Sequence, residues 1–257
     1  MSGASDPASA APQGLGGVLG EIAGTLRPRR GDPHGPLVPM MVALTCVTGV
    51  VDAVSYLELG HVFVANMTGN IVFVGFALAG ASGLSTITSL VAIGSFLIGA
   101  MAGGRLGARS ADHRGDLLRA ASAAQALLML AALLIALTVD QPLSSAARYA
   151  LVVPLALAMG VQNASAQRLA IPELTTTVLT RTLTGIASEA QIAGGRGSQF
   201  GRRSVAVAAM LLGALIGALL ALHVSIASAL AVALALVVCV GVAVHVASRS
   251  SAAWTRA

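Results

Sequence analysis

The sequence predicts an all-α protein that crosses a membrane several times, and three observations support this fold class. Of its 257 residues, 56% are hydrophobic and only 10% are charged, whereas soluble proteins carry roughly 25% charged residues. The mean hydropathy is +0.86. Apolar runs of about 20 residues, enough for a helix to cross a bilayer core, recur along the chain. A soluble surface cannot be covered with so few charges, so we expect the chain to lie in a lipid bilayer.

The N-terminal region, residues 1–37, is rich in Gly, Pro, Ala and Ser and contains a basic cluster of Arg27, Arg29 and Arg30. This composition predicts a disordered tail beside the membrane. Within it, residues 15–26 are apolar enough for a short interfacial helix, although their glycines disfavour one. A basic cluster followed by a full-length apolar span does not fit a cleaved signal peptide. The C-terminal residues, 248–257, are predicted to form a second short tail.

Six segments between the tails are long and apolar enough to span a bilayer. They are residues 38–58, 85–105, 118–139, 146–167, 203–223 and 225–247. Two further segments, 61–81 and 171–190, are ambiguous because they carry polar residues in their middle. The first holds Asn66, Thr68, Gly69 and Asn70, and the second holds Thr175, Thr176, Thr177, Thr180, Arg181, Thr182 and Thr184. Both are too polar for ordinary lipid-facing helices.

The placement of arginine decides between two topologies. All 15 basic residues are arginine. If all eight segments spanned, the arginine-rich loop 105–119 would lie on the side opposite the N-terminus, against the positive-inside rule. If the two ambiguous segments enter and leave on the same side, 13 of the 15 arginines share one face. The sequence therefore predicts six spanning helices and two re-entrant or broken segments, with both termini in the cytoplasm. Irregular backbone is tolerated at membrane depth only where protein or water surrounds it.

An internal repeat accompanies this topology. Residues 49–53 (GVVDA) match residues 160–164 (GVQNA) at an offset of 111, and residues 64–70 roughly match 176–182 at an offset of 112. A GxxxG pattern at Gly99 and Gly103 matches Gly213 and Gly217 at an offset of 114. The order is the same throughout, which indicates a duplication into repeats over 38–139 and 140–247. With six spans the two repeats are inverted, as in many secondary transporters.

Asp52 is the first candidate site residue, because it lies well inside the first span. A carboxylate in hydrocarbon costs several kcal/mol unless it is paired, solvated or protonated. It therefore has two interpretations, a hydrogen-bonded residue that locks helix packing or a group that carries a coupling proton. Its counterpart in the second repeat is Asn163, which is neutral, so only Asp52 is a candidate for proton coupling.

The polar residues of the two ambiguous segments are the other candidates. Amides and hydroxyls both donate and accept hydrogen bonds, so they can replace the water shell of a polar solute. The same residues can instead hold helices together. The candidates for binding a solute or ion are Asp52, Asn66, Thr68, Gly69, Asn70, Gln162, Asn163, Thr176, Thr177, Thr180 and Arg181. Arg181 has three open interpretations: pairing with Asp52, binding an anion, or reaching toward the cytoplasm.

Several classes of function are excluded by residues that the chain lacks. Without lysine it cannot form a phosphate-loop nucleotide site or a Schiff base. Its cysteines, Cys46 and Cys239, are isolated in apolar runs, and its five histidines show no metal-binding spacing. We therefore expect no catalytic activity, metal or cofactor. The net charge of +5 reflects arginines beside apolar spans, so membrane topology explains it better than nucleic-acid binding.

The residues VDAVSYLELGHVFVANMTGN (51–70) and GVQNASAQRLAIPELTTTVLTRTLTG (160–185) resemble the signatures of the YoaK family. These are bacterial integral membrane proteins whose domain is of unknown function, and the resemblance covers about residues 38–247. It implies a polytopic protein of the bacterial inner membrane, with about six spans, that is sometimes suggested to be a small-molecule permease. Arg181 departs from the family pattern, which favours a small residue at this position.

The favoured function is a secondary transporter or permease for a small polar or anionic solute, with Asp52 as the candidate for proton coupling. One alternative is a channel with a constriction at Asn66, Asn70, Thr177 and Thr180. Another is a membrane scaffold or partner subunit that acts through its GxxxG faces. Those faces also raise the question of a homodimer, because small residues allow close helix packing within or between chains.

Overall fold

The protein is all-helical, as predicted, throughout the residues that the computed structural model describes, which are 15–27, 34–110, 113–170, 179–188, 200–248 and 254. The helices are α1 (Leu15–Leu26), α2 (Leu37–Glu58), α3 (Met67–Leu78), α4 (Thr86–Arg109), α5 (Arg114–Ala136), α6 (Ser145–Leu169), α7 (Leu179–Ser188), α8 (Phe200–His223) and α9 (Ile226–Ala247). Helix α1 coincides with the short helix considered at residues 15–26. Residues 1–14 and 28–33 of the predicted N-terminal tail, and 249–253 and 255–257 of the predicted C-terminal tail, lie outside the described residues.

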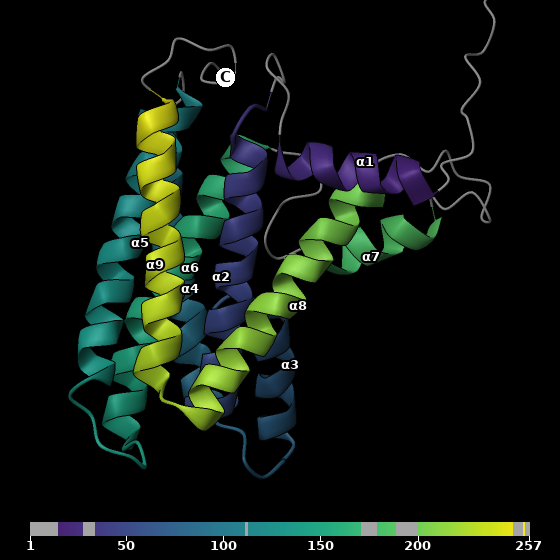
Figure 1. The fold of residues 1–257 in the computed structure, drawn as a ribbon. Helices are drawn as coiled ribbons and strands as arrows, with labels where there is room; N and C mark the ends of the chain where they lie inside the picture. The colour runs from purple at the N-terminus through teal and green to yellow at the C-terminus, as the bar shows by residue number, and fades with distance from the viewer. Residues whose placement is uncertain are drawn as a thin grey trace, which may run out of the picture.

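Six of these helices are long and apolar enough to cross a membrane, which confirms the six predicted spans. They are α2, α4, α5, α6, α8 and α9, and they alternate in direction along the bundle (Figure 1). We call the end where α2, α5 and α8 begin the terminal face, because α1 and the end of α9 both lie there (Figure 1). The end of α4 and the start of α5, with Arg109 and Arg114, lie at this face, whereas Arg148 near the start of α6 is at the opposite face.

Serine residues begin three of the spanning helices at the face opposite the terminal face. The hydroxyls of Ser85, Ser144 and Ser225 each accept a hydrogen bond from the backbone N–H three residues later, at 3.2, 3.2 and 3.1 Å. Such caps satisfy N–H groups that the first turn of a helix leaves without a partner. They fix where α4, α6 and α9 begin.

Glycines bring two pairs of helices into backbone contact. At one crossing, Gly49 of α2 faces Gly213 of α8, and a Cβ added at Gly213 would lie 2.1 Å from the carbonyl oxygen of Cys46. At the other, Gly160 of α6 faces α4, and a Cβ added at Gly99 would lie 2.1 Å from the carbonyl oxygen of Leu157. No real Cβ tolerates such distances, so only glycine permits these crossings.

Both GxxxG patterns therefore pack within a single chain. Gly99 and Gly103 are covered by α6, and Gly213 and Gly217 are covered by α2. The glycine faces considered for a homodimer are already occupied, so they do not support that dimer. Each repeat predicted from sequence contributes one helix to each crossing. An inverted duplication would give this pairing of helices from different repeats. The inversion itself stays a prediction.

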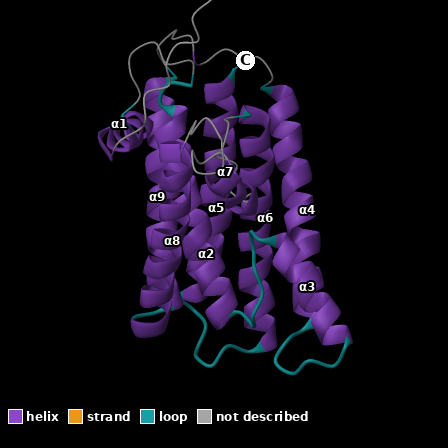
Figure 2. Ribbon diagram, turned by 90° about the vertical axis from the view of Figure 1, so that its right-hand side faces the viewer, coloured by secondary structure: helices purple, strands orange, loops and turns teal. Residues whose placement is uncertain are grey.

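The first ambiguous segment enters and leaves the bundle on the same side, as expected of a re-entrant segment. After α2 the chain turns through Gly60 and His61, whose φ angles of 95° and 55° lie in the left-handed region. Residues 61–66 then rise along the bundle to the start of α3, which descends again (Figure 2). With 12 residues, α3 is about 18 Å long, short of the roughly 30 Å of a bilayer core.

The second ambiguous segment is described only in part. Residues 171–178 lie outside the described residues, and the following helix α7 has 10 residues. It lies near the terminal face, beside the start of α8 (Figure 1). Whether residues 171–190 re-enter the membrane stays a prediction.

Candidate functional site

Asp52 holds the backbone of the re-entrant segment. Its side chain on α2 is buried, and Oδ1 accepts hydrogen bonds from the N–H groups of Val64 (3.1 Å) and Ala65 (2.8 Å). Extended backbone has no internal partner for these groups, and lipid offers none. The carboxylate therefore takes the place of water for a segment that is neither helix nor sheet.

Asn70 completes the support of this segment from the other side. Its side-chain oxygen accepts from the N–H of Phe63 at 2.9 Å, and its Nδ2 donates to the carbonyl oxygen of Phe63 at 2.7 Å. Gly69 lies against the same residue, because an added Cβ would come within 2.7 Å of the Phe63 ring. Both residues thus serve to close the turn between the extended segment and α3.

Aromatic rings fix the segment near the face opposite the terminal face. Tyr56 of α2 stacks on Phe63 with ring centroids 5.2 Å apart, and Phe63 stacks on Phe73 of α3 at 5.6 Å. His61 meets the edge of Tyr56 at 5.3 Å. These ring contacts pack the segment against α2 and α3.

A polar pocket lies at the start of α3, between α3, α4 and α6, and we call it the α3 pocket. Its volume is about 240 Å³. It is lined by Ala65, Asn66, Met67, Thr68, Phe96, Ala100, Asn163, Ala164 and Gln167. Asn66 precedes the helix but makes no side-chain cap on it. The first-turn N–H groups of a helix carry partial positive charge, so the pocket combines amides and a hydroxyl with a site that favours negative charge.

The structure divides the predicted site residues outside the threonine-rich segment into four groups. Asn66, Thr68 and Asn163 come together in the α3 pocket. Asp52 is not among the lining residues and is joined to the pocket wall through its hydrogen bond from the N–H of Ala65, so its part in binding a solute or ion stays a prediction. The other groups are the turn-forming Gly69 and Asn70, and Gln162.

Gln162 belongs to a buried polar network rather than to the pocket. Its amide nitrogen, Nε2, donates to Thr48 Oγ1 at 2.9 Å, and its Oε1 accepts from Gln125 Nε2 at 2.6 Å. A cavity of about 10 Å³ adjoins this network. The hydroxyl oxygens of Ser122 and Ser165 line it, are buried, and have no hydrogen-bond partner among the described residues. A cavity of that size accommodates about one water molecule.

The threonine-rich candidates are placed only in part. Thr176 and Thr177 lie outside the described residues. Thr180 is exposed on α7, and the side chain of Arg181 lies outside what the structure describes. Their proposed role in binding a solute remains a prediction.

The sequence analysis did not single out two polar residues that the structure places in or beside the candidate site. Gln167 lines the α3 pocket, and Gln125 bonds to Gln162 across the α5–α6 interface. Gln125 had a usable signal, since it is a lone amide in the middle of an apolar run. Gln167 had none, because an amide near the end of a span is expected at any membrane surface.

Comparison with known proteins places the chain in a family. The profile of the family described as "Protein of unknown function (DUF1275)" matches residues 40–243. A curated relative, the UPF0700 transmembrane protein YoaK of Bacillus subtilis (strain 168), is 30% identical over 151 residues, which are 58% of this chain and 65% of the relative. The match thus spans just under two thirds of that relative. No solved structure matches. The chain is a multi-pass membrane protein and belongs to the DUF1275 family.

Proposed function

We propose that this member of the DUF1275 family is a permease for a small polar solute, which binds in the α3 pocket. The observation that carries the proposal is a polar pocket at a helix start, on the side of an apolar bundle. Polar groups at membrane depth are costly unless they are hydrogen-bonded or reached by water. Broken helices of this kind form substrate sites in known transporter folds.

The lining of the α3 pocket indicates the chemistry of the solute. Its polar side chains, Asn66, Thr68, Asn163 and Gln167, are uncharged and can both donate and accept hydrogen bonds. The start of α3 adds a preference for an oxygen acceptor, such as a carbonyl or carboxylate. The volume of about 240 Å³ is below the roughly 300 Å³ at which pockets for drug-sized ligands begin, so the solute is small.

Asp52 is proposed as a positioning residue that couples transport to protons. Its Oδ2 is buried and has no hydrogen-bond partner among the described residues, while Oδ1 holds the N–H of Ala65 in the pocket wall. A proton bound at Oδ2 removes the negative charge and weakens the bond to that wall. Exchange of the proton would thereby alter the pocket without contact between Asp52 and the solute.

Swelling of proteoliposomes tests the binding site with a panel of small polar solutes. Vesicles containing the protein are mixed with iso-osmotic glycerol, glycine or acetamide, and the swelling rate is followed by light scattering. We expect at least one solute to enter faster than into protein-free vesicles. The double variant Asn66→Leu/Thr68→Val should slow that entry about fivefold or more, because two hydrogen bonds are lost.

Thr138→Val is the matched control for the swelling experiment. This threonine is exposed just after the end of α5 and is not part of the pocket lining. The substitution removes a threonine hydroxyl, as Thr68→Val does. Its rate should equal that of the unsubstituted protein. Equal rates with and without protein for all three solutes would overturn the permease proposal.

Two further measurements separate the mechanisms. A permease accumulates labelled solute transiently in counterflow, whereas a channel with a polar constriction does not. If Asp52 couples protons, Asp52→Asn removes the dependence of uptake on a pH gradient while the protein still inserts. Uptake that keeps its pH dependence in this variant would exclude Asp52 from coupling.

We propose that the terminal face is cytoplasmic, because the arginines at the end of α4 and at the starts of α5 and α8 lie there. In a chain with Cys46 and Cys239 replaced by alanine, Ser82→Cys marks the opposite face and Ala108→Cys marks the terminal face. A membrane-impermeant maleimide added to whole cells should label only the cysteine at position 82. Labelling at position 108 without permeabilisation would reverse the orientation.

A further inference from the structure

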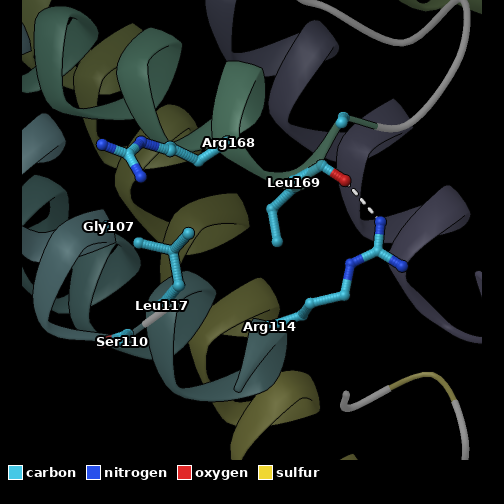
Figure 3. A pocket seen from close by; sticks show the side chains of 7 residues that line it. Gly107, Ser110, Arg114, Leu117, Arg168 and Leu169 are labelled. Atoms are coloured by element: carbon cyan, nitrogen blue, oxygen red, sulfur yellow. Dashed lines mark hydrogen bonds between the residues drawn. The ribbon is translucent and has the colours of Figure 1, made fainter. Parts of the chain in front are cut away.

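A second pocket lies at the terminal face and is separate from the α3 pocket. Its volume is about 350 Å³, and it lies between the end of α4, the start of α5 and the end of α6. It is lined by Gly107, Ser110, Arg114, Leu117, Arg168, Leu169 and Ala170. Figure 3 shows the guanidinium groups of Arg114 and Arg168 on opposite sides of it. We call it the arginine pocket.

Each arginine is held in place by its neighbours. Arg114 donates through Nη2 to the carbonyl oxygen of Leu169, where α6 ends (Figure 3). The stem of Arg168 lies against Gly107, since a Cβ added there would be 3.0 Å from Cγ of Arg168. A side chain in place of the Gly107 hydrogen would push this stem aside. The fold therefore positions Arg114 by a hydrogen bond and Arg168 by its stem, and leaves the end of Arg168 exposed.

Among the residues that the structure describes, the lining carries positive charge and no carboxylate. Asp116, on the first turn of α5, is an acid of this region that the structure describes, but it does not line the pocket. Its Oδ1 pairs with Arg119 Nη2 at 3.1 Å, and its Oδ2 faces His113 at 3.5 Å. Within the described residues, the two arginines of the pocket thus have no acidic partner in its lining. The carbonyl of Leu169 uses one nitrogen of Arg114 and leaves further donors available.

We propose that the arginine pocket binds a phosphate group. A guanidinium group donates paired N–H bonds to phosphate oxygens, so the arginines of this lining suit a phosphate group. The Ser110 hydroxyl adds another donor to the lining. Basic pockets between spanning helices are common sites for phosphate-containing lipid headgroups. The volume of about 350 Å³ leaves room for the group that carries the phosphate. This site does not depend on the permease proposal.

Binding by the purified protein in detergent tests this proposal with two probes at constant ionic strength. One is inorganic phosphate, with affinity measured by titration calorimetry. The other is phosphatidylglycerol, whose retention relative to phosphatidylcholine is measured by native mass spectrometry. We expect Arg168→Gln to weaken binding of the recognised probe about tenfold, because a charged hydrogen bond is lost. The variant Arg114→Gln/Arg168→Gln should abolish it.

Arg109→Gln is the control, because it removes one charge from the same face but does not line the pocket. It should bind like the unsubstituted protein. Selective retention of phosphatidylglycerol identifies a lipid headgroup as the source of the phosphate, whereas binding of inorganic phosphate alone identifies a soluble one.

The two arginines also lie beside the negatively charged ends of α4 and α6, which cations stabilise. If Arg168→Gln lowers the melting temperature but changes binding of neither probe, the arginines only cap helices and the proposal fails. Arg168→Gln leaves the bond between Arg114 and Leu169 intact, so this result is obtainable even if the double variant does not fold.

Discussion

Two helix crossings in this molecule have similar packing but differ in the polar residue that follows. Gly49 of α2 lies against α8, and Gly160 of α6 lies against α4. Three residues further along, α2 carries Asp52 and α6 carries Asn163. Asp52 binds the backbone of the re-entrant segment, whereas Asn163 donates to Met159 of its own helix at 2.9 Å and lines the α3 pocket. Small residues set how closely the helices approach, and the neighbouring polar position takes a different role at each crossing.

The largest effect is expected where the two crossings are alike. Gly99→Ala and Gly213→Ala each place a Cβ 2.1 Å from a backbone carbonyl oxygen of the facing helix. Overpacking of this kind costs about 3 kcal/mol, because the helices must separate. Thermal unfolding in detergent should show similar losses for the two variants if the crossings are equivalent.

Gly94→Ala and Gly104→Ala are the controls for this prediction. Both glycines are in α4, and an added Cβ would meet nothing within 4 Å. They should be neutral or stabilise the helix by up to about 1 kcal/mol, because alanine is the better helix former. If these variants lose as much stability as Gly99→Ala, the loss at Gly99 does not come from close packing between the helices.

The next effect separates the two polar positions. Asp52→Leu leaves the buried N–H groups of Val64 and Ala65 without their acceptor, which should cost about 2 kcal/mol or more. Asp52→Asn keeps an acceptor oxygen and should cost less. Amide hydrogen exchange at residues 64 and 65 should accelerate in the leucine variant.

Asn163→Leu is the comparison that sharpens this contrast. It should cost clearly less stability than Asp52→Leu, because its hydrogen bond to Met159 lies within one helix. It should instead slow solute entry in the swelling assay. Equal stability losses at both positions would remove the distinction between a residue that supports the fold and one that lines the pocket.

A smaller effect is expected within the re-entrant segment. Asn70→Leu removes both hydrogen bonds to Phe63 and should cost about 1.5 kcal/mol. Asn66→Leu should leave the melting temperature nearly unchanged, because Asn66 is exposed and caps no helix. A larger loss of stability for Asn66→Leu than for Asn70→Leu would contradict the role of Asn70 in supporting the turn.

The smallest effect is expected in the glutamine network. Gln125 and Gln162 share a hydrogen bond of 2.6 Å between α5 and α6. A double-mutant cycle with Gln125→Leu and Gln162→Leu should give a coupling energy of about 0.6 kcal/mol, typical of side-chain hydrogen bonds inside membranes. A coupling energy of zero would show that the two amides stabilise the bundle independently.

Much of the fold could be predicted because its signals are local. Six apolar runs of sufficient length predict six spans, and the arginines at their ends favour an even number of spans. The structure also has six helices that are long and apolar enough to span. The re-entrant segment at residues 61–81 was predicted from its central polar residues. The family resemblance based on residues 51–70 and 160–185 is confirmed by the family profile.

The candidate site could be predicted only as a set of residue types. Asn66, Thr68 and Asn163 stand out as polar residues in apolar runs, and they do meet in one pocket. Asp52 and Asn70 stand out equally, yet both support backbone. Their roles depend on which N–H or carbonyl group the folded chain brings beside them, and the residue type alone does not predict that partner.

Membrane insertion, the number of spans and the residues too polar for lipid can all be read from the order of amino acids. These properties follow from the transfer free energies of short segments, which the residues of each segment set. The folded bundle was needed to learn that the glycines pack within one chain, that Asp52 lies behind the α3 pocket, and that Arg114 and Arg168 share another pocket. Those outcomes depend on contacts between segments far apart in the chain, whose approach is set by the packing of all the helices together.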